Sequence, residues 1–321
     1  MSSLGDRPAG SPPVWRIRHG EIALDRPIVV GILNVTPDSF SDGGRFVTVE
    51  AAVAQAERMV TEGADVIDIG GESTRPQGAV GVSPDEEIRR IVPVVRGVRA
   101  RFADIPISVD TSKSHVASAA INEGANIIND VSAFRLDPRV REIAARVGAG
   151  VVLMHSRGTV DEMGTYRHAQ YDGDVVSEAI AELRRALDTA MKAGVQKANI
   201  VLDPGIGFAK RSRHSLEVLA SLERFAALGC AVMVGVSRKR FIGELSHVTA
   251  ADERIAGTVG ANVAALMRGA RLFRVHDVAP NRQALDVAWG VLHPEQWERL
   301  GAVNGAEVPR SPFPGPRSQA Q

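Results

Sequence analysis

One complete repeat of the predicted fold lies in residues 28–69, which read IVVGILNVTPDSFSDGGRFVTVEAAVAQAERMVTEGADVIDI. It opens with a short run of β-branched and apolar residues at 28–33, which is typical of a buried strand. After a loop, apolar residues recur at helical spacing at Val49, Ala52, Val53, Ala56 and Val60. A second apolar run at 65–69 ends the unit. The stretch therefore predicts a strand, a helix and a second, parallel strand.

The same alternation continues along the chain. Further strands are predicted at 105–109, 126–128, 150–153, 199–202, 231–236 and 271–275. Further helices are predicted from Ser83 onward and at 112–122, 137–147, 173–193, 213–227, 238–268 (in two pieces) and 279–292. Eight strand–helix units with near-continuous apolar strands predict a parallel, eight-stranded (β/α)8 TIM barrel.

Helix boundaries carry their own signals. Ser83 is placed as an N-cap, Pro84 as the first helical residue and Glu86 as the capping-box partner, and Pro93 is expected to kink this helix. A doubly wound sheet is the alternative fold. It would need a glycine-rich phosphate loop after the first strand, and the sequence there reads NVTPDSF instead.

Composition limits the class of protein. The chain has 321 residues with 38 basic and 38 acidic side chains, and this balance argues against a nucleic-acid-binding protein. No apolar run is long enough to predict a membrane span. One cysteine excludes a disulfide framework and, with no apolar signal segment, predicts a cytoplasmic protein. Low-complexity ends predict a disordered leader at 1–13 and a disordered tail at 298–321, around a single barrel domain at 14–297.

Polar residues follow nearly every predicted strand. They include Asn34, Glu72, Ser73, Thr74, Arg75, Asp110, Asn129, Asp130, Met154/His155, Asp203, Ser237, Arg238, Lys239, Arg274, His276 and Asp277. Because barrel enzymes build their active sites where the strands end, these side chains are expected to share one rim. Each also has a simpler interpretation: Asp110 can cap a helix, Asp203-Pro204-Gly205 can form a turn, and the histidines can be structural. Asp68, inside a strand, is expected in the barrel interior.

The residue types at this rim suggest two subsites. Asp110, Asn129, Asp203 and Lys239 suit a flat heterocycle that carries N–H donors and a carbonyl. Nearer the rim, Arg75, Arg274 and His276 suit a polyanion such as a diphosphate.

The sequence predicts one kind of metal ligand and argues against another kind of metal site. The carboxamide oxygen of Asn34 is a ligand that Mg²⁺ accepts alongside phosphate oxygens. No zinc-type spacing of ligands is present in the sequence.

Seven ordered motifs carry a resemblance to a known family. They are GILNVTPDSFSDGG (31–44), DIGGESTRP (68–76), SVDTSK (108–113), INDVS (128–132), LDPGIGF (202–208), GVSRKRFIG (235–243) and RVHDV (274–278). With these motifs the sequence resembles dihydropteroate synthase over essentially the whole predicted domain. The resemblance implies a magnesium-dependent transferase, a homodimer and sulfonamide target, that joins 4-aminobenzoate to a dihydropterin carrying a hydroxymethyl diphosphate. No nucleic-acid or membrane partner is expected.

The resemblance also implies roles for individual residues. The pterin would be bound by Asp110, Asn129, Met154, Asp203 and Lys239; the diphosphate by Thr74, Arg75, Arg274 and His276; the 4-aminobenzoate by Phe40, Thr74, Pro76, Phe208 and Ser237; and magnesium by Asn34. The catalytic residues would be Asp110, Asp203, Lys239 and Asp38, which lies in the first long loop.

The sequence departs from the family pattern at two places. STRPQGA has one residue added or shifted near Gln77, and in MHSRG a methionine is replaced by Ser156.

The charges at the site favour a dissociative, SN1-like substitution, because arginine, histidine and magnesium would stabilise the departing diphosphate. A corrinoid-type pterin methyltransferase and a non-catalytic pterin-binding protein are the competing functions. The Ser237-Arg238-Lys239 run and the Arg274/His276 pair argue against the first, and the intact charged residues argue against the second.

Overall fold

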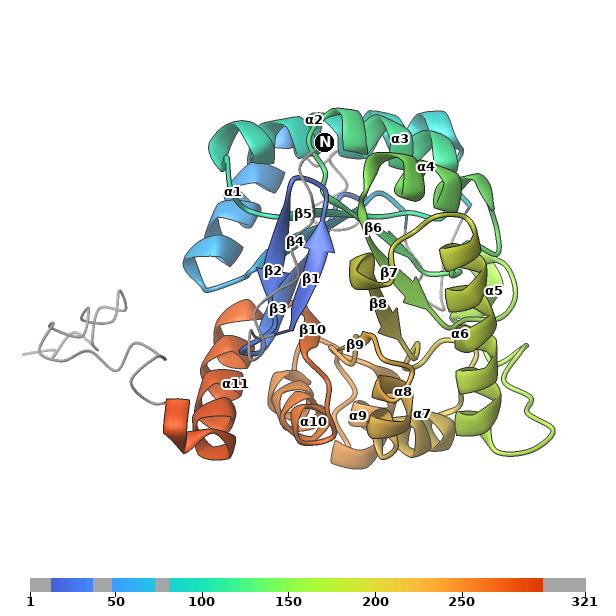
Figure 1. Ribbon diagram of the computed structural model, residues 1–321. Coiled ribbons are helices and arrows are strands. Elements are labelled where there is room, and N and C mark those ends of the chain that lie inside the picture. Colours follow the sequence, from blue (N-terminus) through green and yellow to red (C-terminus); the bar gives the residue numbers. More distant parts are fainter. Residues whose placement is uncertain (1–12, 37–47, 73–80, 297–321) are drawn as a thin grey trace, which may run out of the picture.

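Eight parallel strands form a closed barrel surrounded by helices (Figure 1). The computed structural model describes residues 13–36, 48–72 and 81–296. The barrel strands are β3 (Ile28–Asn34), β4 (Val66–Gly70), β5 (Ile107–Asp110), β6 (Ile127–Asp130), β7 (Gly150–Met154), β8 (Ile200–Asp203), β9 (Ala231–Val234) and β10 (Leu272–Val275). They follow one another around the barrel, and β10 closes it by pairing with both β9 and β3. The predicted (β/α)8 fold is confirmed.

The helices of the described residues follow the strands in alternation. They are α1 (Val49–Thr61), α2 (Pro84–Arg101), α3 (Ser114–Asn122), α4 (Arg139–Val147), α5 (Val160–Met163), α6 (Val175–Lys192), α7 (Ser212–Leu219), α8 (Leu222–Ala226), α9 (Arg240–Ser246), α10 (Ile255–Met267) and α11 (Val278–Leu292), with short 3₁₀ turns η1 (Lys197–Asn199) and η2 (Pro294–Gln296). The prediction of one helix over 213–227 is wrong. The chain leaves helical geometry at Ser221, and the new helix α8 buries Leu222 and Phe225 completely. The predicted leader and tail lie outside the described residues, except for Pro13.

Helix α2 begins with the predicted N-cap and first-turn proline, but the prediction that Glu86 closes a capping box is wrong. The Ser83 hydroxyl accepts a hydrogen bond from the backbone N–H of Glu86 at 3.3 Å, and Pro84 occupies the first helical position. The carboxylate of Glu86 turns away to accept a bond from Arg90 Nε at 2.8 Å. The helix continues through Pro93 to Arg101.

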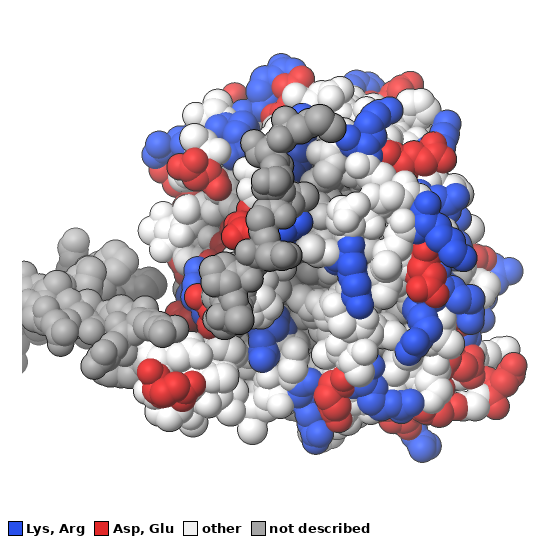
Figure 2. Space-filling model, in the orientation of Figure 1, with Lys and Arg blue, Asp and Glu red and all other residues white. Residues whose placement is uncertain are grey.

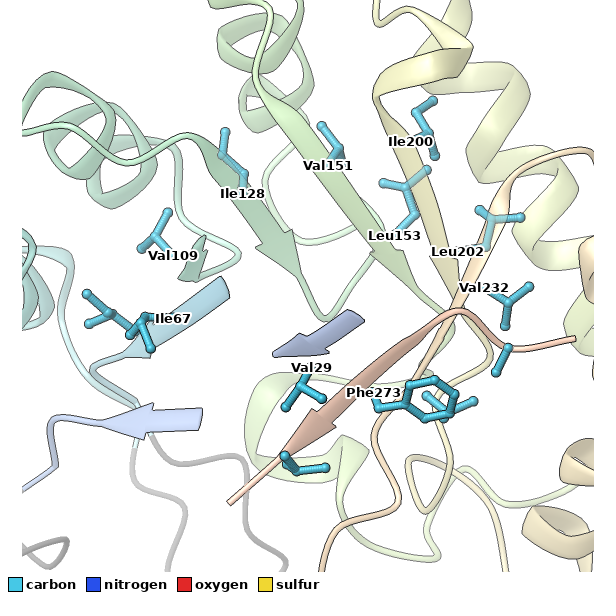
Figure 3. Packing of buried hydrophobic residues seen from close by; sticks show 14 of the residues in the cluster. Val29, Ile67, Val109, Ile128, Val151, Leu153, Ile200, Leu202, Val232 and Phe273 are labelled. Carbon is cyan, nitrogen blue, oxygen red and sulfur yellow. The ribbon is translucent and has the colours of Figure 1, made fainter. Parts of the chain in front are cut away.

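Strand residues alternate between two apolar cores. On β7, Val151 and Leu153 pack outward in the layer between the barrel and its helices (Figure 3), while Val152 points into the barrel. The interior layer at the amino ends of the strands is apolar. Its members are Ile28, Val30, Val66, Ile127, Val152, Val201, Met233 and Leu272, packed against Trp15 and Leu24.

An antiparallel hairpin, β1 (Val14–Ile17) and β2 (Gly20–Ala23), was not predicted. It lies across the amino ends of the barrel strands, at the front of Figure 1. Trp15 is buried there, and its indole N–H donates to the backbone oxygen of Asn199 at 2.8 Å. The hairpin therefore closes the amino end of the barrel and leaves the carboxyl ends of the strands for the site.

Charged side chains of both signs are interspersed around the margin of the face that bears this hairpin (Figure 2). This distribution agrees with the balanced composition of the chain. Among the described residues, no helix has the length and apolar character needed to cross a membrane.

Candidate active site

A layer of buried polar side chains lies above the apolar interior layer. Because Ile67 and Ile69 pack outward, the residue between them, Asp68, points into the barrel and is completely buried. Its Oδ2 accepts hydrogen bonds from Asn129 Nδ2 at 3.1 Å and from Arg274 Nε at 2.6 Å. The interior position predicted for Asp68 is confirmed, and it links strands β4, β6 and β10.

Arg274, predicted near the rim as a diphosphate ligand, is paired with two carboxylates of this layer. Its backbone on β10 lies beside Val30, and its side chain retains 20% exposure. Its Nη2 donates to Asp110 Oδ2 at 2.7 Å, so the guanidinium bridges Asp68 and Asp110. Burial disfavours the charged guanidinium, but the two carboxylates outweigh burial and raise the pKa of Arg274.

Asp110 is a carboxylate of this layer whose pKa is shifted toward neutral pH. Burial raises its pKa to about 7, with Arg274 opposing the shift and Asp68 adding to it. The side chain retains 15% exposure, at the end of β5. It can therefore accept a donor from a ligand in the barrel mouth while Arg274 holds its other side.

Asp203 and Lys239 are two further charged residues of the site, and each affects the pKa of the other. Asp203, at the end of β8, is buried, and burial raises its pKa to about 6. Its Oδ1 accepts a bond from the backbone N–H of Gly205 at 2.7 Å. Burial and then Arg274 lower the pKa of Lys239 to about 8, against the opposing effect of Asp203. Lys239 Nζ lies 3.7 Å from the ring centroid of Phe208, a cation–π contact.

Met154 supplies the apolar part of the site. It is paired in register with Asp203 on the neighbouring strand and is buried with Val131 and Met163, against which Phe208 packs. Ser156, one of the departures from the family pattern, is also buried, and its hydroxyl donates to the backbone oxygen of Val131 at 2.6 Å.

Ser237 and His276 meet at the ends of β9 and β10. The hydroxyl of Ser237 lies 2.9 Å from His276 Nδ1 and accepts a bond from the backbone N–H of His276 at 3.2 Å. Arg238, which follows Ser237 in the chain, turns away to pair with Asp277. Asn34 ends β3, where its neighbour on β4 is Gly70.

Several predicted site residues lie outside the described residues. They are Asp38, Phe40, Thr74, Arg75 and Pro76, with Gln77 of the STRPQGA departure. The other predicted site residues stand at the carboxyl ends of barrel strands or just beyond them, and Arg274 stands one residue before the end of β10.

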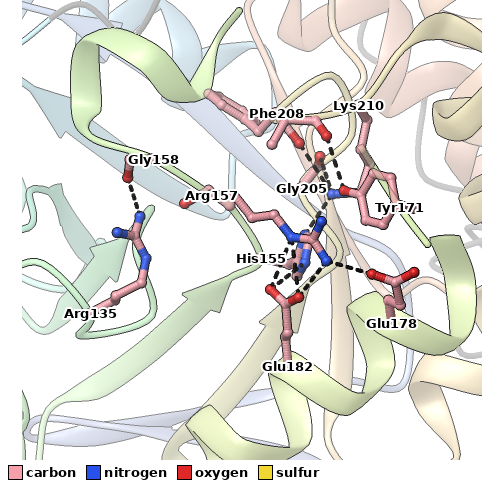
Figure 4. Close-up of polar contacts among 12 residues, drawn as sticks. Arg135, His155, Arg157, Gly158, Tyr171, Glu178, Glu182, Gly205, Phe208 and Lys210 are labelled. Atoms are coloured by element: carbon pink, nitrogen blue, oxygen red, sulfur yellow. Dashed lines mark hydrogen bonds and ion pairs between the residues drawn. The ribbon is translucent and has the colours of Figure 1, made fainter. Parts of the chain in front are cut away.

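A network around the buried side chains of His155 and Lys210 has no counterpart in the sequence-based prediction. Figure 4 shows Lys210 beside His155, and His155 beside Glu182 and Arg157. The sequence predicts a structural His155 but identifies no partner for it. The only local signal for Lys210 is its place shortly after the Asp203–Phe208 segment.

Comparisons with known proteins agree with this geometry. Residues 30–276 match the family model described as pterin binding enzyme. The dihydropteroate synthase of Clostridium beijerinckii is 43% identical over 261 residues, which is 81% of this chain and 92% of that protein. A longer relative from Haloferax volcanii, described as a probable bifunctional folylpolyglutamate synthase/dihydropteroate synthase, is 44% identical; the match covers 85% of this chain and 32% of that protein.

Solved structures give the same result. The dihydropteroate synthase of Xanthomonas albilineans with 4-aminobenzoic acid is 44% identical, with a TM-score of 0.79 over 90% of this chain and 99% of that one. Its complex with 7,8-dihydropteroate has a TM-score of 0.76 at 42% identity over the same shares of both chains. The motifs, the barrel and these relatives lead to one conclusion: the chain belongs to the dihydropteroate synthase family of pterin-binding enzymes.

Proposed function

We propose that this chain joins 4-aminobenzoate to 6-hydroxymethyl-7,8-dihydropterin diphosphate, giving 7,8-dihydropteroate and diphosphate in folate biosynthesis. The observation that carries the proposal is the polar layer of buried Asn129 and Asp203 with the partly exposed Asp110 and Lys239. This layer offers acceptors for ring N–H groups and one donor for a ring oxygen or nitrogen. The solved relative with 4-aminobenzoic acid and with 7,8-dihydropteroate supports both substrates.

In this proposal the reaction is dissociative. Loss of diphosphate leaves a cationic methylene group conjugated to the pterin ring. The carboxylates of Asp110 and Asp203, held in a largely water-free layer, would stabilise that cation. A weakly basic arylamine can then attack without a strong general base, so positioning supplies most of the remaining rate enhancement.

His276 is proposed to contact the departing diphosphate, with Ser237 orienting its imidazole. Arg274 keeps the diphosphate role predicted for it. Its Nε and Nη2 bind Asp68 and Asp110, which leaves other N–H donors of the guanidinium on a side chain that is 20% exposed, so these donors and the positive charge would act on the diphosphate.

Magnesium is proposed as the cofactor. The carboxamide oxygen of Asn34 is a ligand of the right type, at the carboxyl end of β3. The described residues contain no group of three or more His, Cys, Asp or Glu side chains that could hold a metal, so the ion would share its coordination with substrate phosphate oxygens. When bound, it would neutralise charge on the leaving diphosphate.

A homodimer is proposed from the apolar surface of α7, α9, α10 and α11. A cavity of about 480 Å³ opens between α7, α9 and α10, lined by Leu216, Phe241 and Leu245 among others. Leu245 and Met267 are 63% and 66% exposed, and Val291 on α11 is 75% exposed. Exposed apolar side chains on neighbouring helices are typical of a subunit interface. Light scattering should show a dimer for the wild type and a monomer for a variant carrying L245E and M267E; a monomeric wild type would contradict the proposal.

The decisive experiment mixes the purified chain with the dihydropterin diphosphate, 4-aminobenzoate and Mg²⁺. Formation of both dihydropteroate and diphosphate is expected. Folded protein that binds the pterin without forming product would favour the non-catalytic alternative, and methyl transfer would favour the corrinoid type. The predicted cytoplasmic location is tested separately by cell fractionation.

A further inference from the structure

Among the described residues, Lys210 is the most deeply buried cation. It lies behind the side chains that are proposed to bind the pterin. Its side chain is almost completely enclosed, at 2% exposure. Nζ lies 2.7 Å from His155 Nδ1 and 3.2 Å from each of the backbone oxygens of Gly205 and Phe208 (Figure 4). Burial lowers the pKa of Lys210 to about 7, against the opposing effect of Asp203. The protonated ammonium group carries three N–H donors, and each of them has an acceptor here.

The contacts of His155 fix the direction of the first of these bonds. Its Nε2 lies 3.1 Å from Glu182 Oε2, and an ionised carboxylate only accepts hydrogen bonds. Nε2 therefore carries the proton, and Nδ1 presents a lone pair to Lys210. Burial, with the nearby Lys210 charge, lowers the pKa of His155 to about 4 and keeps the ring neutral. Arg157 in turn holds Glu182, its Nη2 lying 2.6 Å from Oε1.

The segment that Lys210 holds is conformationally demanding. Gly205, Gly207 and Ala209 all have positive φ, at 68°, 75° and 48°. A Cβ atom at position 205 would lie 1.9 Å from the backbone oxygen of His155, so only glycine fits there. Backbone of this kind persists when its surroundings determine it from several sides. Here Lys210 holds two of its carbonyl groups, and the Tyr171 hydroxyl donates to a third, that of Ala209, at 3.0 Å.

The same segment carries the site. Asp203 begins it and is bound by the backbone N–H of Gly205, whose carbonyl accepts from Lys210. Phe208 ends it, with its carbonyl on Lys210 and its ring against Lys239. A shift of these two carbonyl groups would therefore move the Asp203 carboxylate, which is proposed to bind the pterin, and the Phe208 ring, which lies against Lys239.

We propose that Lys210 is a positioning residue of the pterin site, which sets the Asp203 carboxylate and the Phe208 ring by holding the backbone between them. This inference rests on the proposed function, in which Asp203 binds the pterin ring.

The test is a double-mutant cycle on pterin binding. The full-length wild type, K210M, D203N and the double variant are titrated with the fluorescent probe 6-hydroxymethylpterin. K210M should weaken binding about tenfold in the wild-type background and about twofold or less when Asp203 is already replaced. A lysine that only stabilises the fold would weaken binding equally in both backgrounds.

Control variants separate positioning from general stability. K192M removes an exposed lysine on α6 and should bind the probe like the wild type. K210Q retains an N–H donor group and should recover part of the affinity, and it replaces K210M in the cycle if K210M does not fold. Equal losses in both backgrounds, wild-type affinity in a folded K210M protein, or failure of both Lys210 variants to fold would overturn the proposal. Failure of the proposed function is distinguishable, because the wild type itself would then form no dihydropteroate, whereas the cycle measures probe binding alone.

Discussion

Replacing Arg274 by methionine tests the polar layer most directly. Methionine keeps much of the side-chain length and removes the charge. Asp68 would lose its 2.6 Å bond from Arg274 and retain the 3.1 Å bond from Asn129, while Asp110 would lose its 2.7 Å bond. Asp68 Oδ1 already has no partner among the described residues, so the variant leaves a buried and poorly compensated carboxylate.

The cost follows from that geometry. Removing one partner of a buried ion pair destabilises a protein by about 3–5 kcal/mol. For a domain of this size each kcal/mol lowers the unfolding midpoint by about 2–4 °C, so R274M should unfold about 6–20 °C below the wild type.

The loss should also depend on pH, with a defined sign. Without Arg274, which opposes the shift, the pKa of Asp110 rises further above the unfolded value of about 4. The native state then binds protons that the unfolded state has released, so the stability of R274M falls as pH rises from about 5 to 8. The deficit relative to wild type should therefore be larger at pH 8 than at pH 5.

Thermal unfolding followed by circular dichroism at both pH values measures this effect. A D68N/R274M double variant should recover part of the loss, because the buried carboxylate is gone. If R274M unfolds at the wild-type temperature at both pH values and only loses affinity for the diphosphate substrate, the guanidinium acts as an open anion ligand. That result would refute the role of Arg274 as the internal partner of Asp68 and Asp110.

Three further outcomes are expected. Because burial raises the pKa of Asp203 to about 6, pterin affinity measured by fluorescence should fall about tenfold per pH unit below 6, and D203N should show a smaller slope; an equal slope would assign the titration elsewhere. Lys239→Ala should impair the use of both substrates in steady-state kinetics, because its ammonium lies against the Phe208 ring and close to Asp203; wild-type constants would remove it from the site. EDTA should stop turnover and Mg²⁺ restore it, with N34A needing more Mg²⁺ for half-maximal rate; activity that survives chelation would argue against the metal.

The barrel could be predicted because each strand is a separate apolar run with a helical pattern after it, as at 28–33 and 65–69. The hairpin β1–β2 could not, because its strands have four residues each and Trp15 is their one fully buried side chain. Its stability comes from packing against strand ends more than a hundred residues away, which no local pattern records.

The site, too, has a part that could be predicted from the sequence and a part that could not. Asp110, Asn129 and Asp203 could be placed, because parallel strands deliver their last residues to one rim. The pairing of Arg274 with Asp68 could not, because it joins residues 206 positions apart and depends on the stagger between β10 and β4. Lys210 was missed for a related reason: its burial depends on His155, which lies 55 residues earlier in the chain.

The hairpin at the amino end of the barrel also affects the route by which substrates reach and leave the site. Because the apolar interior layer fills the amino end and Trp15 packs against it, whatever reaches the polar layer enters and leaves through the same mouth. The deeper occupant must then arrive first, and a second reactant arriving early stands in its way. The hairpin touches no substrate in the proposed mechanism, but in this way it would impose an order of substrate binding. This order would be visible as substrate inhibition when 4-aminobenzoate is added before the pterin.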